Sequence, residues 1–494
     1  MVAEGRTLAE LGLSARGGAE ARITGISLDS RTVRPGHLFA ALPGSRLHGA
    51  EFVDPALRMG AAAVLTDAAG AAVAAAALSA RPVPVVLAED PRQVLAFAAA
   101  LWFGAQPETT VAVTGTNGKT SVASFTRQIW AALGRQAVNV GTTGIEGAYA
   151  ASGALTTPDT VTLHRLLAEM AAAGVTHAAM EASSHGLDQR RLDAVRLTAA
   201  AFTNLSQDHL DYHGSFDAYF AAKAGLFARV LPEDGVAVIN LDDPRGSDMA
   251  AIAHARGQRL LAVGRAGSAD IRLLAQRAEP TGQILRFSWE GKPFQLRLGL
   301  IGAFQSENVL LAAGLAIAAG EEPERVFAAL PRLQTVRGRM QHVATRGHGA
   351  PVFVDYAHTP AALATALSAL RPHVLGRLIV VFGAGGDRDR AKRPMMGHEA
   401  ARHADVVYVT DDNPRSEDPA AIRAAILSAC PDANEVGDRA EAILRAVDTL
   451  GPGDALLIAG KGHETGQIVG DTVYPFDDAE QASIAVAALE GPDR

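Results

Sequence analysis

A glycine-rich turn that contains a lysine follows an apolar run near residue 115, a pattern typical of a site for nucleotide phosphates. The run Val111–Val113 leads into Thr114-Gly115-Thr116-Asn117-Gly118-Lys119-Thr120-Ser121. Glycines let backbone N–H groups approach phosphate oxygens, and the start of the following helix favours negative charge. Lys119 would reach the β- and γ-phosphates, and the Thr120 hydroxyl would bind Mg²⁺. The sequence therefore predicts that residues 115–121 bind ATP.

This loop departs from the usual phosphate-binding loop in one respect. A glycine normally stands five positions before Gly118, and here that residue is Val113, so the loop is shorter. The alternative interpretation is a tight turn that carries an exposed lysine. A helical pattern follows, with Val122 and Ile129 on one apolar face and Gly134 placed to end the helix. This context favours phosphate binding.

Acidic and histidine side chains later in the chain could complete a cation site. Glu181 ends the apolar run Ala178–Met180, where a carboxylate can meet the cation beside the phosphates; the alternative is a surface glutamate. The segment Asp208-His209-x-Asp211-x-His213 is dense enough to suggest a hydrolytic zinc site, but it lacks a clear third ligand. We favour a magnesium or phosphate role for His209 and a structural role for His213.

Three charged segments in the last third of the chain each follow an apolar run. They are Asp387-Arg388-Asp389-Arg390, Asp411-Asp412-Asn413-Pro414-Arg415 and Gly460-Lys461-Gly462-His463-Glu464. Loops at the carboxyl ends of parallel strands converge on one crevice, so these segments should share a site. Arginine binds carboxylate through paired hydrogen bonds, and an acidic side chain binds ammonium. We predict a pocket for an amino acid; the alternative is a set of turns, since Asp-Asn-Pro is itself a good turn.

Two further motifs do not support other chemistries. Gly383-Ala384-Gly385-Gly386-Asp387-Arg388 follows an apolar run as a dinucleotide-binding fingerprint would, but an arginine occupies the place of the third glycine. His463-Glu464 begins like the helix of a zinc protease, but position 467 is glutamine instead of histidine. Both interpretations are rejected.

The segments that must position these residues alternate between strand and helix patterns. This alternation predicts an α/β protein with parallel sheets covered by helices on both faces. In the middle of the chain we expect strands at 111–113, 176–180, 199–202 and 236–239, with helices at 93–103, 161–173 and 306–319. In the last part we expect strands at 351–354, 378–382, 406–410 and 455–458, with helices at 361–370, 420–430 and 440–450.

Length and composition restrict the possible classes of protein. The 494 residues are too many for one compact core, and we predict three domains at 1–91, 92–333 and 334–494. A net charge of −8 leaves no basic footprint for a nucleic acid. Cys430 is the only cysteine, which excludes an internal disulfide and agrees with a reducing compartment. The chain shows neither a signal peptide nor an apolar span, so we expect a cytoplasmic protein without membrane insertion. Separately, we expect a monomer.

Taken together, these motifs resemble those of the Mur ligase family along nearly the whole chain and in order. The matching segments are Asp29-Ser30-Arg31-x-Val33-x-Pro35-Gly36-x-Leu38-Phe39, His48-Gly49, the loop at 114–121, Thr156-Thr157-Pro158-Asp159, Glu181-Ala182-Ser183-Ser184-His185-Gly186-Leu187, Asn204-Leu205-Ser206-x-Asp208-His209-Leu210-Asp211 and Ala221-Ala222-Lys223. The resemblance implies a central ATPase domain built on a P-loop-type parallel sheet. A uridine-nucleotide-binding domain would precede it, and a Rossmann-like amino-acid-binding domain would follow.

The resemblance also implies an activity. The activity expected from it is that of an ATP-dependent amide ligase that adds meso-diaminopimelate to UDP-N-acetylmuramoyl-L-alanyl-D-glutamate through an acyl phosphate, with Mg²⁺ as cofactor. This reaction belongs to peptidoglycan precursor synthesis, and so to cell-wall biogenesis, cell shape and cell division. The alternatives are a lysine-adding ligase of the same family, a folate-glutamylating enzyme and a nucleotide-dependent switch. The uridine-type first domain argues against the folate enzyme, and the paired arginines argue against the switch.

The resemblance assigns residues to each ligand. For the muramoyl-peptide they are Leu28, Ser30, Thr156, Thr157, Ser183, Gln189 and Arg191. For Mg²⁺ they are Thr120, Glu181, His209 and Lys223, the last as a carbamate. The catalytic group consists of Lys119, Glu181, His209 and Lys223. For the nucleotide they are Asn308, Arg339, Asp355 and His358, in addition to the loop. For diaminopimelate they are Arg388, Asp412, Asn413, Pro414, Arg415, Gly460 and Glu464.

Two positions deserve comparison with the family pattern. The segment Phe304-Gln305-Ser306-Glu307-Asn308 lacks the first asparagine that is usual in the wider family. Lysine-adding relatives carry another residue where Arg415 stands. Diaminopimelate has a second carboxylate that lysine lacks, and Arg415 with Arg388 would pair with it. Leaving buried arginines without that carboxylate should disfavour lysine by on the order of 2–5 kcal/mol.

Overall fold

The computed structural model describes residues 5–16, 21–44, 47–151, 155–206, 208 and 210–490. The chain forms three α/β domains, each built around its own sheet. Two compact units contain them: residues 1–272 with 310–327, and residues 273–309 with 328–494. The first unit holds the N-terminal sheet and most of the central sheet, and the second holds the C-terminal sheet. The domain limits at 91/92 and 333/334 remain predictions.

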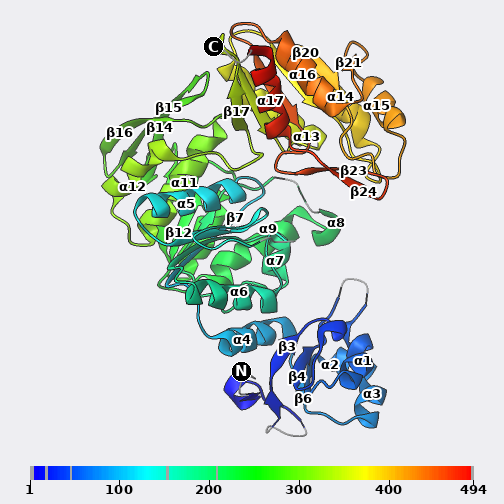
Figure 1. Cartoon of the computed structure of the whole chain (residues 1–494). Coiled ribbons are helices and arrows are strands. Elements are labelled where there is room, and N and C mark those ends of the chain that lie inside the picture. The colour runs from blue at the N-terminus through cyan, green and yellow to red at the C-terminus, as the bar shows by residue number, and fades with distance from the viewer. Residues whose placement is uncertain are drawn as a thin grey trace. The chain divides into compact units, whose positions relative to one another are not determined.

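The N-terminal domain, blue in Figure 1, contains a parallel four-stranded sheet. Leu38 and Ala40 of one strand pack into one apolar cluster, whereas Phe39 packs into another, as the two-residue period of a strand requires. The strands, in spatial order, are β3 (Gly25–Ser27), β4 (His37–Ala40), β5 (Ala63–Thr66) and β6 (Val85–Leu87). The other elements are the pair β1 (Arg6–Thr7) and β2 (Arg22–Ile23), and the helices α1 (Val53–Arg58), α2 (Ala68–Val73) and α3 (Ala75–Ala80). The helix α4 (Pro91–Phe103), which starts at the predicted limit of this domain, packs Leu95 and Ala98 into the same apolar cluster as Leu38.

The central sheet places the glycine-rich loop after its middle strand. In spatial order its strands are β13 (Arg259–Gly264), β12 (Val236–Asn240), β11 (Ala199–Phe202), β7 (Thr109–Thr114), β10 (His177–Glu181), β8 (Ala137–Gly141) and β9 (Gly144–Gly147). The first residues of β14 (Ile271–Glu279) pair with β13, and the strand continues into the second unit. The predicted strands at 111–113, 176–180, 199–202 and 236–239 are therefore confirmed.

Helices cover both faces of the central sheet. Ala112 and Met180 share one core with residues of α6 (Thr160–Ala172), α9 (Phe216–Gly225) and α10 (Gly246–Ala255). On the opposite face, a Cβ at Gly314 of α11 (Phe304–Ala318) would lie 2.8 Å from Val238 Cγ1, so this helix lies directly on β12. α5 (Lys119–Ala132) starts at the end of the glycine-rich loop, and α12 (Pro323–Ala329) follows α11.

The second unit is built on a six-stranded sheet, shown in yellow to red in Figure 1. Its order is β17 (Gln341–Thr345), β18 (Pro351–Asp355), β22 (Ala455–Ala459), β19 (Leu378–Phe382), β20 (Val406–Val409) and β21 (Asn434–Glu435). One core contains residues of α13 (Pro360–Leu370), α14 (Lys392–His403) and α15 (Pro419–Leu427). The other contains residues of α16 (Arg439–Thr449) and α17 (Asp478–Glu490). The helices predicted in this part are confirmed to within three residues at each end.

The predicted parallel sheets are confirmed, and their edges also carry antiparallel strands. β9 is antiparallel to β8, β16 (Lys292–Leu298) to β15 (Gly282–Trp289), and β17 to β18. The connections explain this difference, because links of two residues (142–143 and 290–291) or five residues (346–350) are too short to carry the chain back to form a parallel strand. Glu290 and Gly291 join β15 to β16 at φ values of +49° and +78°, as a two-residue hairpin requires.

Within the described residues, no helix is both long and apolar enough to cross a membrane. The predictions of a monomeric state and of no nucleic-acid partner remain predictions.

A buried histidine in the central core should make stability depend on pH. His164 of α6 is 1% exposed, and its Nε2–H donates to the carbonyl oxygen of Asp193 at 3.1 Å. Burial lowers the pKa of His164 to about 4. The unfolded chain, with a histidine pKa near 6.5, binds the proton first as the pH falls. Folding should therefore lose roughly 2 kcal/mol between pH 7.5 and pH 5.

His164→Met should remove this dependence. Between pH 7.5 and pH 5 the thermal unfolding midpoint should fall in both proteins. We expect the fall to be smaller in the variant than in the unmodified protein, and the difference to be about 4–8 °C. His348→Met, at an exposed position, is the control and should behave like the unmodified protein. Equal acid sensitivity of the protein and the His164 variant would contradict the assignment.

Candidate functional site

The glycine-rich loop has the backbone geometry that close approach to phosphate requires. It starts at the end of β7, and Gly115 and Gly118 have φ values of +147° and +86°. A Cβ at Gly115 would overlap the hydroxyl oxygen of Thr203. Glycine is needed at both positions, because L side chains rarely adopt such φ values. Gly118 is followed directly by the first turn of α5, which contains Thr120 and Ser121.

Hydrogen bonds hold this loop in one conformation. Lys119 Nζ donates to the carbonyl oxygens of Gly115 and Thr116 at 2.9 and 2.8 Å. Thr203 donates its hydroxyl to the carbonyl oxygen of Asn117 at 2.6 Å. The residues predicted to bind ATP through this loop, 115–121, thus form one continuous strand–loop–helix unit. Their contacts with ATP remain a prediction.

Glu181 is buried beside this loop, so the alternative of a surface glutamate is wrong. It is 2% exposed and ends β10, where it is the register partner of Val113 in β7. Its carboxylate accepts hydrogen bonds from the backbone N–H and the hydroxyl of Thr142, at 2.8 and 3.3 Å. Thr142 lies in the tight turn between β8 and β9 and was missed by the sequence reasoning. The Gly141-Thr142-Thr143-Gly144 pattern of a hairpin was the signal available for it.

Lys223 lies against the same loop from a different helix. This residue of α9 is 1% exposed, and its Nζ donates to the Gly115 carbonyl oxygen at 2.7 Å, the oxygen that Lys119 also contacts. Burial, and then the charge of Lys119, lower the pKa of Lys223 to about 6. A lysine amine with this pKa is mostly neutral at pH 7, which is the form that can react with CO₂.

The donor set beside the loop fits a magnesium ion. Mg²⁺ prefers oxygen ligands, and the Glu181 carboxylate and the Thr120 hydroxyl supply them. His209 lies outside the described residues. In the part of the chain that the structure describes, no three histidine, cysteine or acidic side chains gather in a way that could hold a metal. The ring of His213 lies 5.3 Å from that of Tyr219 and 4.8 Å from that of Tyr212, an aromatic packing consistent with a structural role.

Five of the residues predicted to hold the muramoyl-peptide lie close to Glu181. The hydroxyl of Thr157 donates to the Glu181 carbonyl oxygen at 2.9 Å and lies 3.0 Å from the Ser183 hydroxyl. Arg191 donates to the Thr157 carbonyl oxygen at 2.6 Å and to Gln189 Oε1 at 2.8 Å. The fifth residue, Thr156, contacts the hydroxyl of Thr142 at 3.1 Å. These side chains therefore form one connected polar group.

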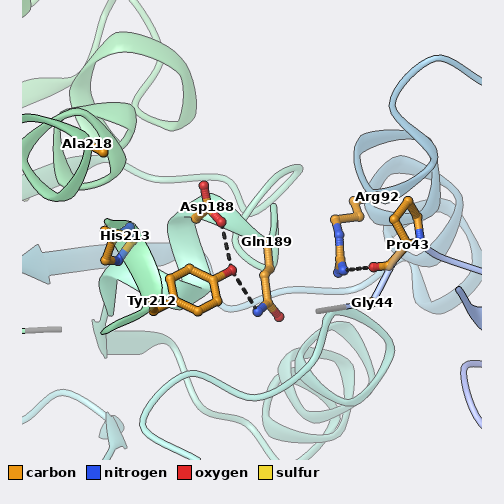
Figure 2. A pocket seen from close by; sticks show the side chains of 8 residues that line it. All are labelled: Pro43, Gly44, Arg92, Asp188, Gln189, Tyr212, His213 and Ala218. Carbon is orange, nitrogen blue, oxygen red and sulfur yellow. Dashed lines mark hydrogen bonds between the residues drawn. The ribbon is translucent and has the colours of Figure 1, made fainter. Parts of the chain in front are cut away.

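Gln189 of this group also lines a cavity of about 690 Å³, and Figure 2 shows the side chains around it. In it, the Gln189 amide donates to the hydroxyl oxygen of Tyr212 at 3.1 Å, and that hydroxyl donates to Asp188 at 2.8 Å. Arg92 and Tyr212 were not predicted; Tyr212 lies inside the 208–213 segment that was interpreted only for its histidines. Leu28 and Ser30 do not line this cavity. The lining residues are Pro43, Gly44, Arg92, Asp188, Gln189, Tyr212, His213 and Ala218.

The other residues predicted to contact the nucleotide belong to the second unit. Asp355 ends β18, and its carboxylate accepts from the backbone N–H groups of Met340 and Ala357 at 2.7 and 2.9 Å. Burial raises the pKa of Asp355 above its usual range. The Arg339 guanidinium lies 5.1 Å from the ring centre of Tyr356.

His358 and Asn308 are the other two residues of the second unit that were predicted to contact the nucleotide. His358 donates from Nδ1 to the Tyr356 carbonyl oxygen at 2.9 Å, close to the end of β18. Asn308 of α11 is 5% exposed and donates to Gln305 Oε1 at 3.1 Å. The contacts of all four residues with ATP remain predictions.

The charged loops of the C-terminal domain meet, as their position after parallel strands predicted. Asn413 donates from Nδ2 to Glu464 at 2.9 Å, and a Cβ at Gly460 would lie 2.6 Å from Asp412 Oδ2. Lys461, which is fully buried, donates to Asn413 Oδ1 at 3.0 Å. Lys461 had been quoted in the motif but given no role. The ammonium of Lys461 fixes the orientation of the Asn413 amide, because Oδ1 must face it.

Arg388 and Arg415 are brought to the same glycine. A Cβ at Gly385 would lie 2.9 Å from Arg415 Nη1 and 3.8 Å from Arg388 Cγ. Arg415 is half-buried and donates to the Gly386 carbonyl oxygen at 2.8 Å, whereas Arg388 is exposed. The expectation that both arginines are buried is therefore wrong for Arg388. Arg415 has a φ of +52°, which is unfavourable for a residue with a side chain. Two guanidinium groups on adjoining loops suit a ligand carboxylate.

These features define a class of protein. A phosphate-type loop with a buried carboxylate and a buried lysine lies in the central α/β domain, and loops that carry arginines and acids meet in another. This is the arrangement of a nucleotide-dependent enzyme that also binds an amino-acid-like molecule.

Comparisons with known proteins are more specific. Models of three Mur ligase domains match the chain: the family catalytic domain at 22–103, the middle domain at 113–316 and the glutamate ligase domain at 338–462. A UDP-N-acetylmuramoyl-L-alanyl-D-glutamate–2,6-diaminopimelate ligase from Bradyrhizobium diazoefficiens is 52% identical, over 95% of this chain and 96% of its own. The ligase of the same name from Caulobacter vibrioides is also 52% identical, with the same coverage. The chain belongs to the Mur ligase family.

Solved structures agree with this assignment. A structure of a ligase with that name is 32% identical, has a TM-score of 0.76, and is matched over 99% of this chain and 100% of its own. A Mycobacterium tuberculosis folylpolyglutamate synthase complexed with ADP is 21% identical, with a TM-score of 0.61 over 82% of this chain and 95% of its own. The second likeness shows the fold alone.

Proposed function

We propose that this protein is an ATP-dependent amide ligase that adds meso-diaminopimelate to UDP-N-acetylmuramoyl-L-alanyl-D-glutamate, in the cytoplasmic synthesis of peptidoglycan precursors. The observation that carries the proposal is the likeness, over nearly the full length, to ligases named for this substrate and this amino acid. The geometry supports it independently. Arg388 and Arg415 flank one glycine, as recognition of the second carboxylate of diaminopimelate requires.

The first step activates the substrate carboxylate. The γ-phosphoryl group of ATP is transferred to the side-chain carboxylate of D-glutamate, which gives an acyl phosphate and ADP. The backbone N–H groups of the loop and Lys119 hold the phosphates and neutralise their charge. The polar group of Thr157, Ser183 and Arg191 would hold the peptide end of the UDP substrate.

The second step forms the amide bond. An amine of diaminopimelate attacks the acyl carbon, inorganic phosphate leaves, and the amine releases a proton. Glu464 and Asp412 would bind an ammonium group of the amino acid, while the arginines bind its second carboxylate. The protein thus contributes mainly position and charge, as expected for phosphoryl and acyl transfer.

Mg²⁺, when bound, would neutralise charge on the phosphates. Thr120 and Glu181 would hold it, together with His209 and the carbamate formed when Lys223 takes up CO₂. The low pKa of Lys223 supports this modification, because the neutral amine is the reactive form. A carbamate would replace a buried amine by an anionic oxygen ligand.

The test is ATP-dependent release of phosphate with UDP-N-acetylmuramoyl-L-alanyl-D-glutamate, comparing meso-diaminopimelate with lysine. We expect release with diaminopimelate, and turnover with lysine lower by roughly thirtyfold or more. Release with lysine alone would replace the proposal by a lysine-adding ligase. Hydrolysis of ATP that needs neither the UDP substrate nor an amino acid would indicate a nucleotide-dependent switch.

A further inference from the structure

The two arginine-bearing loops of the C-terminal domain touch through their backbones. One loop follows β19 and spans residues 383–391, and the other follows β20 and spans residues 410–418. Gly386 N–H donates to the Asn413 carbonyl oxygen at 2.9 Å, and a Cβ at Gly386 would overlap the Pro414 carbonyl oxygen. The loops therefore approach as closely as a glycine allows.

Two carboxylates lock this contact reciprocally. Glu417, on the second loop, accepts from the backbone N–H of Asp387 on the first at 2.7 Å. Asp387 in turn accepts from the hydroxyl and the backbone N–H of Ser416, at 2.6 and 3.2 Å. The φ of Asp387 is +52°, a conformation that costs free energy unless surrounding contacts hold it.

A buried arginine anchors the lock. Arg393 of α14 has a side chain that is 4% exposed, and it donates two hydrogen bonds to the Glu417 carboxylate at 2.9 and 3.1 Å. Arg390 lies 3.1 Å from the same carboxylate. The hydrogen bonds from Arg393 lower the pKa of Glu417 to about 2, so the carboxylate is ionised at any working pH. We call Asp387, Arg393, Ser416 and Glu417 the carboxylate clasp.

The clasp adjoins both arginines of the predicted amino-acid pocket. Arg388 directly follows Asp387, and Arg415 directly precedes Ser416. Neither of these two arginines forms a hydrogen bond to the carboxylate of Asp387 or Glu417. Arg415 donates instead to the Gly386 carbonyl oxygen of the facing loop. The separation of the two guanidinium groups therefore depends on how the two loops are held together.

We propose that Glu417, anchored by Arg393, is a positioning residue that sets the separation of Arg388 and Arg415 and thereby the preference for an amino acid with a second carboxylate over lysine. This inference rests on the proposed function. A second carboxylate bound by two guanidinium groups needs both at the correct distance, because misplacement by about 1 Å can cost about a hundredfold in rate.

The test is Glu417→Gln, which keeps the shape of the side chain and removes its charge. We expect the KM for diaminopimelate to rise about ten- to a hundredfold, since the arginines are no longer held. The KM values for ATP and for the UDP substrate should stay within about twofold, and lysine turnover should change little, so the preference for diaminopimelate falls. Glu441→Gln is the control, because Glu441 forms only an exposed ion pair with Arg445 on α16.

Two further measurements make the outcome decisive. Amide hydrogen exchange in residues 384–391 should become faster in the Glu417 variant. Ser416→Ala should give the same changes to a smaller extent, and it replaces the Glu417 variant in the test if that variant does not fold. A KM for diaminopimelate that stays unchanged while exchange becomes faster would overturn the inference. An equal rise in the KM values for diaminopimelate, ATP and the UDP substrate would also overturn the inference, since it would indicate a purely structural role. The unmodified protein in the same assay decides the proposed function separately, through its use of diaminopimelate.

Discussion

Lys119→Ala is expected to reduce ATP-dependent phosphate release by roughly a hundred- to a thousandfold. Lys119 is the positively charged side chain of the loop, and its Nζ donates hydrogen bonds to the Gly115 and Thr116 carbonyl oxygens. Without it, the charge that builds up on the transferred phosphoryl group loses its nearest counter-charge in the loop. Phosphate release with saturating UDP substrate and diaminopimelate measures the effect.

Two comparisons isolate the role of this charge. Lys292→Ala, at an exposed position in β16, should leave the rate unchanged. The thermal unfolding midpoint of the Lys119 variant shows whether the loop still folds, because the lost hydrogen bonds are local. Turnover near the unmodified rate would exclude Lys119 from the phosphate site.

Arg415→Met should lower kcat/KM for diaminopimelate by about thirty- to several-thousandfold, the equivalent of on the order of 2–5 kcal/mol. The guanidinium of Arg415 lies beside Gly385, which the side chain of Arg388 also approaches through Cγ, and both arginines would pair with the second carboxylate. Methionine keeps much of the volume and loses the charge. Because lysine has no second carboxylate, its poor turnover should hardly change.

The measurement is kcat/KM for both amino acids with each variant. Arg402→Met, an exposed change on α14, serves as the control and should resemble the unmodified protein. If kcat/KM for diaminopimelate stays near the unmodified value in the Arg415 variant, the arginines do not bind the second carboxylate. The selectivity must then come from other residues.

Features that depend on neighbouring residues were predictable from the sequence. The phosphate loop is one, because its function resides in consecutive backbone N–H groups and two glycines with positive φ. The main strands and helices are another, since the period of apolar residues reports which face of an element is buried. The strand predicted at 378–382 matches β19 at both ends.

Features that depend on distant residues could not be predicted in the same way. Thr142 binds Glu181 across 39 positions of the chain, and Lys223 reaches Gly115 across 108. Without the resemblance, Lys223 is a single lysine in an alanine-rich helix, and its low pKa follows only from burial in the folded domain. The antiparallel edge strands were also missed. β9 and β17 have only four and five residues, whereas β15 and β16 have eight and seven, so shortness does not explain why those two were missed.

The sequence by itself therefore determined the α/β class, the main strands and helices, the glycine-rich loop and the charged loops of the C-terminal domain. Only the tertiary structure decided which of these groups are neighbours: Lys223 against Gly115, Thr142 against Glu181, and the clasp between the two arginine loops. The physical reason is that backbone conformation and apolar periodicity are local properties of a chain. Burial, pKa and side-chain contacts arise instead from packing between segments far apart in it.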